Sequence, residues 1–204
     1  MANQDAPFGF RAVGGMGSSY ETQGTSKYQI NDNYTTAIYQ GDVVMTGDGG
    51  NDAGTNTSVA GYIAPSAVGD NNNVGIFNGC FYNDPTTQKP TWKNYYPGAI
   101  NITQGYIDAF VYDNPQQLYE SQTAGTLTQS DAGNLIDMAT YAAGSTVNGS
   151  SNEELHTASI SNTATFRIIR LSGDPSNSDT SSANSNWIVR FNESIYYDRA
   201  VKTA

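Results

Sequence analysis

The chain has 204 residues, which is enough for one domain with a substantial hydrophobic core. Its net charge is −10 and its nine basic residues form no cluster, so the composition argues against binding to nucleic acid. Charged residues make up only 14% of the chain while Tyr alone contributes 14 residues, a balance that favours a folded all-β protein over a disordered one.

The sequence also argues against a membrane location and against export. No apolar run approaches the roughly 18 residues of a transmembrane helix, and the N-terminal residues lack the basic start and apolar centre of a signal peptide. We therefore expect a protein that is made in the cytoplasm and has no membrane partner. Cys80 is the single cysteine, so an intramolecular disulfide is excluded, and we expect Cys80 to pack as a small apolar group.

Residues 1–26 are interpreted as an extended N-terminal arm. They contain five glycines and no periodic pattern, and their only apolar cluster is 7–10. Ordering such a segment costs roughly 1–2 kcal/mol of backbone entropy per residue, so we expect it to add little to the fold and to become ordered on a partner. Pro7, Phe8, Phe10 and Arg11 are the expected contact residues, with Arg11 pairing with an acid across the interface. A frayed terminus is the alternative.

From residue 27 onward, short apolar or alternating runs separated by Gly, Asn and Pro predict strands. The predicted strands are 27–30, 34–39, 42–45, 59–64, 74–82, 91–96, 100–103, 106–112, 117–122, 135–138, 154–160, 163–171 and 186–191. Thr128 and Asp131 have the spacing of a helix start, but Gly133 limits this helix to one turn. Residues 172–185 are a polar loop with little to bury.

These elements predict an all-β fold, an antiparallel sandwich or barrel of jelly-roll-like type with the extended arm. The expected organisation is an arm at 1–26, a single β domain at 27–192 and a tail at 193–204.

Residues 74–98 carry the most information. Residues 74–82 are apolar on both alternating faces, which predicts a buried strand. Pro85 supplies a turn, and 91–96 resumes as a second strand. We interpret this aromatic hairpin as architecture rather than as a catalytic loop, with the loop 83–90 as a possible contact element.

The sequence offers no convincing catalytic or metal site. The Gly/Asp-rich loop 47–54 supplies too few oxygens for calcium and is better interpreted as solvated. His156 is the only histidine, and a Cys80–His156 nucleophile pair would need an exposed Cys80. Asp131 and Asp137 could in principle be the paired carboxylates of a glycosidase, but a chance pair is expected among 19 acidic residues and no third feature supports this one. We expect no catalytic residue, no cofactor and no metal.

The aromatic residues of the hairpin and the C-terminal tail admit two interpretations. They either form a contact or sugar-stacking patch, as Tyr and Trp do in many interfaces, or cover the edges of the core. The residues concerned are Trp92, Tyr95, Tyr96, Tyr196 and Tyr197.

Five segments, in this order, resemble a known protein family. They are MANQDAPFGFR at 1–11, GIFNGCFYNDPTTQKPTWKNYYP at 75–97, AFVYDNP at 109–115, ATFRIIRL at 164–171 and WIVRFN at 187–192. The chain resembles the capsid decoration, or cement, proteins of tailed bacteriophages over nearly its whole length. Residues 193–204 depart from the family, whose members often lack such an extension.

The resemblance implies a non-enzymatic virion protein on the outer surface of the capsid. Its partners would be the major capsid protein and further copies of itself, as a trimer or, second, a dimer. Pro7, Phe8, Phe10, Arg11, Trp92, Tyr95 and Tyr96 are the expected partner-binding residues. A glycan-binding or host-adhesion module and a tail or head-fibre subunit remain as alternatives.

Overall fold

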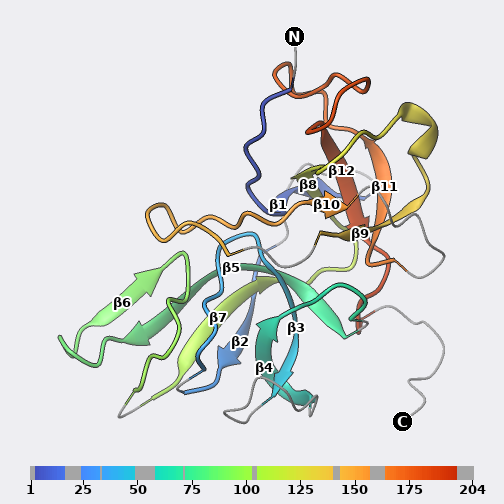
Figure 1. Ribbon diagram of the computed structural model, residues 1–204. Coiled ribbons are helices and arrows are strands. Elements are labelled where there is room, and N and C mark those ends of the chain that lie inside the picture. Colours follow the sequence, from blue (N-terminus) through green and yellow to red (C-terminus); the bar gives the residue numbers. More distant parts are fainter. Residues whose placement is uncertain are drawn as a thin grey trace.

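Strands form nearly all of the regular structure in the computed structural model, which describes residues 3–16, 24–32, 34–48, 58–70, 72–102, 105–139, 143–156 and 164–196. The strands are β1 (Arg11–Gly15), β2 (Ser26–Ile30), β3 (Val43–Asp48), β4 (Ser58–Pro65), β5 (Asn73–Asn83), β6 (Pro90–Lys93), β7 (Ile107–Tyr112), β8 (Gln117–Gln122), β9 (Leu135–Met138), β10 (Leu155–His156), β11 (Phe166–Leu171) and β12 (Asn186–Phe191). They form two sheets (Figure 1), which confirms the predicted all-β fold. The predictions at 17–23, 49–57, 103, 157–163 and 197–204 lie outside the described residues.

One sheet closes into a small barrel. Its strands follow the order β3-β4-β2-β7-β5-β6, and β3 also pairs with β5, which completes the ring. Every second side chain of β7 is buried, as expected for a strand that turns one face to the core of the barrel. One pairing differs from the antiparallel expectation, since β2 and β4 are parallel, with Gln29 opposite Tyr62. The intervening β3 supplies the crossover that parallel strands require.

Strand β5 contributes to two cores, which explains its continuous apolar sequence. Phe77 and Cys80 pack inside the barrel, whereas Ile76 points the other way, into the core of the second sheet. The predicted burial of both faces is therefore confirmed for the first half of the strand only. In the second half, Phe81 is 39% exposed.

The second sheet has the order β1-β8-β12-β11-β9-β10. Trp187, Val189 and Phe191 alternate along β12 and are buried in its core. β10 is the last strand in this order, yet its Leu155 makes an isolated parallel bridge to Thr123, one residue beyond β8. The last strand of the sheet therefore approaches the end of β8 at this point. Long-range pairings of this kind give no local sequence signal.

The N-terminal segment is part of this sheet, so the prediction that the arm adds little to the fold is wrong for residues 3–16. β1 pairs antiparallel with β8, with Arg11 opposite Glu120. Phe10 is 1% exposed, and its ring stacks on Phe166 with centroids 4.4 Å apart. The entropy of ordering the segment is offset by the backbone pairing of β1 with β8, which is interrupted by a bulge between Ala12 and Gly14, and by burial of one large side chain.

The same segment also orders the polar loop 172–185. Asn3 donates from Nδ2 to the carbonyl oxygens of Asp179 and Ala183, both at 2.8 Å. Gln4 and Asn177 exchange two hydrogen bonds, of 2.9 and 3.1 Å. The loop has little apolar area to bury, so these hydrogen bonds hold it in place.

The predicted strands at 34–39 and 100–103 are absent from the described parts of these ranges. Ile38 and Tyr96 form only an isolated bridge. The Tyr96 hydroxyl donates to the Tyr34 carbonyl oxygen at 2.8 Å and accepts from the Ile100 N–H at 3.2 Å. The Tyr96 hydroxyl thus connects two segments that do not pair as strands. The expected second strand of the hairpin ends at Lys93 rather than at Tyr96.

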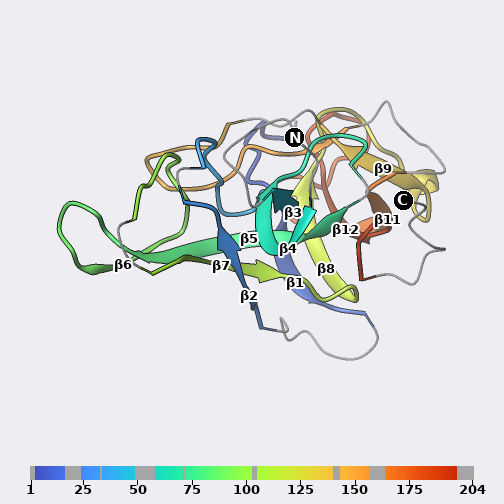
Figure 2. The ribbon, with the colours of Figure 1, turned by 90° about the horizontal axis from the view of Figure 1, so that it is seen from below.

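The hairpin of β5 and β6 projects from the rest of the molecule (Figure 2). Its turn is held internally, because the Asp84 carboxylate accepts the N–H groups of Thr86 and Thr87 at 2.9 and 2.8 Å. The predicted single helical turn is confirmed as the 3-10 turn η1 (Gln129–Asp131), where Asp131 accepts the Thr128 N–H at 2.8 Å.

The first residues of the tail pack on the barrel, with the Ile195 N–H donating to Asn73 at 2.9 Å. Within the described residues, no helix has the length and hydrophobicity needed to cross a membrane.

Candidate functional site

The seven predicted contact residues do not share one surface. Phe10 and Tyr96 are buried in the two different cores, at 1% and 0% exposure, so their assignment as exposed partner contacts is wrong. Pro7, Phe8 and Tyr95 are half-buried, while Arg11 and Trp92 are exposed. Aromatic residues that fill a core and those that cover its outside look alike in sequence, and only the pairing of the strands separates them.

Arg11 pairs within its own chain rather than being free for a partner. Its guanidinium forms a salt bridge with Glu120, its opposite residue on β8. The guanidinium carbon also lies over the Phe8 ring, 4.8 Å from the centroid. Tyr95 is likewise used internally, since it stacks on Tyr39 with ring centroids 5.7 Å apart.

Trp92 belongs to an exposed cluster that we call the aromatic face, formed by Phe81, Trp92 and Phe110 on the outside of β5, β6 and β7. Phe81 and Trp92 are opposite each other across β5 and β6. The Trp92 and Phe110 rings contact at 5.1 Å between centroids with a 52° tilt. Trp92 is 51% exposed.

A glycine makes room for the aromatic face. Gly79 lies opposite Phe110 at a bulge in β5. A Cβ at this position would lie 2.6 Å from the Trp92 ring and 2.9 Å from the Lys93 carbonyl oxygen, so any side chain would displace the tryptophan. The aromatic ring therefore lies across the sheet because residue 79 has no side chain.

Charged residues border the aromatic face. Lys27 on β2 is opposite Phe110, and Asp108 on β7 is opposite Phe81. Lys27 Nζ and Asp108 Oδ2 form a surface salt bridge of 3.1 Å. An apolar centre with a polar rim is the usual composition of a protein-binding surface. The sequence interpretation found Trp92 but missed Phe81 and Phe110, whose outward direction follows from the in–out alternation along β5 and β7.

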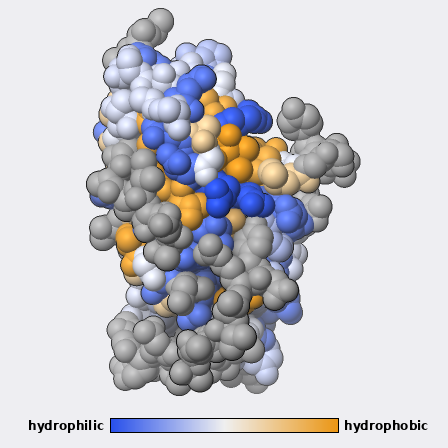
Figure 3. Space-filling view, turned by 90° about the vertical axis from the view of Figure 1, so that its right-hand side faces the viewer, coloured by the Kyte–Doolittle hydropathy of each residue, from blue (hydrophilic) through white to orange (hydrophobic). Residues whose placement is uncertain are grey.

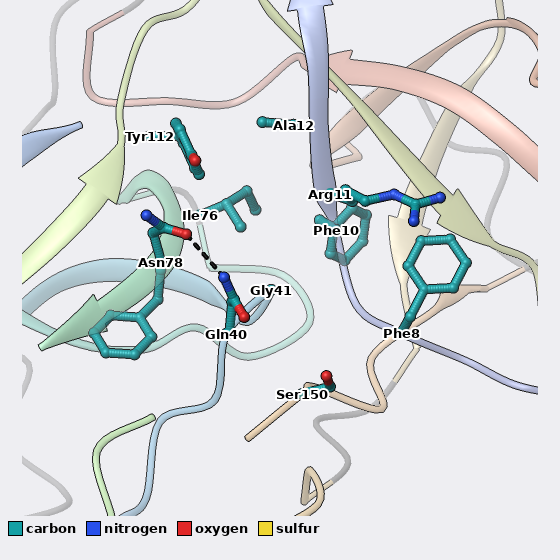
Figure 4. Close-up of a pocket in the computed structure, with 11 residues that line it drawn as sticks. Phe8, Phe10, Arg11, Ala12, Gln40, Gly41, Ile76, Asn78, Tyr112 and Ser150 are labelled. Carbon is teal, nitrogen blue, oxygen red and sulfur yellow. Dashed lines mark hydrogen bonds between the residues drawn. The ribbon is translucent and has the colours of Figure 1, made fainter. Parts of the chain in front are cut away.

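A cavity of about 260 Å³ lies where the N-terminal strand meets the barrel. Figure 4 shows Phe8 and Arg11 on one side of it and Tyr112, Asn78 and Gln40 on the other. Gln40 Nε2 donates to Asn78 Oδ1 at 3.0 Å. The cavity lining combines aromatic rings with neutral amides and hydroxyls.

A carboxyl pair, Asp42 and Glu153, is buried close to this cavity. Asp42 directly follows Gly41 of the cavity lining, and the Glu153 carbonyl oxygen accepts the Gly9 N–H at 3.2 Å. Both residues are 0% exposed. Asp42 Oδ2 accepts the Tyr39 N–H at 2.7 Å, and Glu153 Oε2 accepts the Val43 N–H at 2.9 Å. Burial first, and then the negative charge of Asp42, raise the pKa of Glu153 well above its ordinary value. Glu153 therefore holds its proton to higher pH than an exposed glutamate does, and sequence reasoning did not find this pair.

The other candidate reactive groups have structural roles. Cys80 is buried, and burial raises the pKa of its thiol to about 12, which leaves it a poor nucleophile at neutral pH. Cys80 and His156 belong to different sheets. Asp131 caps η1, and Asp137 accepts from the Thr165 N–H at 2.8 Å.

Metal-binding side chains are not grouped in the described part of the chain, where no three His, Cys, Asp or Glu residues come together. Residues 49–57 of the Gly/Asp-rich loop lie outside it.

Exposed apolar residues also occur away from the aromatic face. The side of the molecule opposite β6 shows hydrophobic groups between hydrophilic ones (Figure 3). Exposure alone therefore does not single out the aromatic face. Its distinguishing feature is that Phe81, Trp92 and Phe110 gather on the outside of the projecting hairpin and the adjoining strand β7. Comparison with known proteins adds no family to this picture, because no protein-family model, no curated protein and no solved structure matches the chain.

Proposed function

We propose that this protein is a virion structural protein that binds the outer surface of a bacteriophage head and stabilises the shell by bridging major capsid protein subunits. The observation that carries the proposal is the aromatic face, whose exposed rings Phe81 and Trp92 lie on the projecting β5–β6 hairpin beside Phe110 of β7. Segment 75–97, which forms most of this face, is also one of the segments in which the sequence resembles the decoration family.

The aromatic face is suited to rigid docking. Trp and Tyr are enriched among the residues that dominate binding energy, and a ring that is already fixed loses little entropy on binding. Gly79 and the Trp92–Phe110 contact hold the tryptophan in place. The net charge of −10 suits a partner whose surface is neutral or basic at the contact.

Stabilisation follows from linkage. A protein that binds the assembled shell and not the free subunits shifts the assembly equilibrium toward the shell by mass action. Bridging several subunits suits a homo-oligomer on or near a symmetry axis, with a trimer as the first choice and a dimer as the second.

Replacement of Trp92 by alanine is expected to weaken binding to particles by about tenfold or more, which corresponds to loss of a contact worth roughly 1.4–2 kcal/mol. Co-sedimentation of the recombinant protein with particles that lack it measures this effect. The matched control is Tyr106→Ala. The Tyr106 ring is 66% exposed, compared with 51% for Trp92, and no ring contact joins it to the aromatic face within the described residues.

Copy number separates the proposal from its rivals. Quantitative mass spectrometry of purified particles should show this protein in numbers comparable with the major capsid protein. A few copies per particle would instead indicate a tail, fibre or host-adhesion part and would overturn the proposed function.

A further inference from the structure

We propose that the cavity between the N-terminal strand and the barrel binds a neutral saccharide. This site is separate from the aromatic face and does not depend on the proposed docking to a shell. It comprises the aromatic side chain of Phe8 on one side and Gln40, Asn78, Tyr112 and Ser150 on the others.

The backbone around the cavity is fixed before any ligand arrives. The Phe10 N–H donates to Gly41 at 2.9 Å, and the Gly41 N–H donates to Phe77 at 2.9 Å. Gly9 has a φ of 75°, and a Cβ there would lie 2.6 Å from the Ser151 Cβ. Only glycine allows the N-terminal strand to approach the 150–153 segment this closely. A preformed site loses less entropy on binding.

The polar groups of the cavity match sugar hydroxyls. Gln40 Nε2 donates to Asn78 Oδ1, so the Asn78 Nδ2 is a donor on this rim. The Gln40 Oε1 accepts a long hydrogen bond of 3.5 Å from Asn94 Nδ2, and its second lone pair is an acceptor on the same rim. The hydroxyls of Tyr112 and Ser150 make no side-chain hydrogen bond within the described residues, and each can donate and accept. A sugar hydroxyl also donates and accepts, so it can replace the water that binds such groups.

The charge distribution selects a neutral ligand. Arg11 is the charged residue of the cavity lining, and its guanidinium is already neutralised by Glu120. Because the chain as a whole carries −10, an anionic ligand would also be repelled at long range. Among the described residues that line the cavity there is no carboxylate to bind a cation.

The size and the apolar walls favour a single sugar ring. The volume of about 260 Å³ lies just below the range of sites for drug-sized ligands. Phe8, Ala12 and Ile76 supply apolar surface, which a sugar ring can cover with its C–H groups while its hydroxyls face the amides. Gln40 is exposed, so a longer glycan can continue outward past it.

The test is a titration of the ¹⁵N-labelled full chain with glucose, galactose and N-acetylglucosamine, followed by amide chemical shifts. We expect shifts confined to residues around 8–12, 40–41, 76–78 and 112, with a dissociation constant on the order of 1 mM for the best sugar. Glucuronate, which matches glucose in shape but carries a carboxylate, should bind at least about fivefold more weakly.

Two variants localise the site. Tyr112→Phe removes only a hydroxyl and Asn78→Ala removes only an amide. Each variant should raise the dissociation constant of the tightest-binding sugar by about 2–10-fold. Tyr106→Phe, outside the cavity, should change nothing. The proposal is overturned if no neutral sugar shifts these amides at tens of millimolar, if glucuronate binds equally well, or if binding survives both variants. Tyr112→Phe should leave particle binding intact and Trp92→Ala should leave sugar binding intact, so the two proposals fail independently.

Discussion

Replacement of Phe10 by alanine is expected to lower the free energy of unfolding by about 3–5 kcal/mol, the usual cost of removing a buried phenylalanine. The ring is 1% exposed and packs on Phe166 within the core of the second sheet. Its loss leaves a cavity where β1 joins β8, so the N-terminal strand should detach at lower denaturant concentration. Urea unfolding followed by tryptophan fluorescence measures the change, since Trp187 lies in the same core.

The matched control is Phe8→Ala, two residues earlier in the same segment. Phe8 is half-buried and contacts Arg11 at the surface, so its removal should cost about 1 kcal/mol or less. If Phe10→Ala were as mild as Phe8→Ala and only particle binding suffered, the segment would be an arm for a partner after all.

The free energy of unfolding of the wild-type protein is expected to fall as pH rises, because Glu153 must give up its proton. Replacement of Glu153 by glutamine should abolish this pH dependence. The folded pKa of Glu153 is raised, so the folded protein holds a proton that the unfolded chain has released above the ordinary value of 4.5. The stability that this proton contributes is complete below that value and is lost as pH rises toward the folded pKa. Each pH unit in this window costs about 1.4 kcal/mol.

Glutamine resembles the protonated acid and keeps an oxygen for the Val43 N–H, so it should match the wild type near pH 4 and exceed it at pH 8. Thermal or urea unfolding across this range measures the difference. Asp84→Asn is a control of opposite sign. Hydrogen bonds from Thr87 and Thr86 lower the pKa of Asp84, so its contribution is present at neutral pH and is lost as pH falls. A constant offset between Glu153→Gln and wild type at every pH would contradict the raised pKa of Glu153.

Much of the fold could be predicted from local patterns. The strands β9 and β12 have the predicted limits, and η1 forms where Thr128 and Asp131 predict it. These elements depend on alternation and capping within a few residues, which the sequence shows directly. The apolar residues at 34–39 predict a strand, but no neighbouring strand pairs with them. Ile38 forms only an isolated bridge with Tyr96.

The candidate sites were much less predictable. Trp92 was identified from its residue type, but Phe81 and Phe110 join it only because β5 pairs with both β6 and β7. The Asp42–Glu153 pair and the cavity beside it join residues more than a hundred positions apart. Nothing in either local sequence indicates that such residues meet.

The sequence by itself determined the all-β class, the positions of most strands, the buried state of Cys80 and the acidic surface, because each depends on composition or on a period of two residues. The tertiary structure alone decided that residues 3–16 form a strand of the second sheet, that β3 closes a barrel with β5, and which aromatic rings face outward. The physical reason is that a side chain is buried only when another part of the chain packs over it. A side chain such as Phe10 is apolar in any sequence, but whether it lies in the core or on the outside depends on which distant strand covers it.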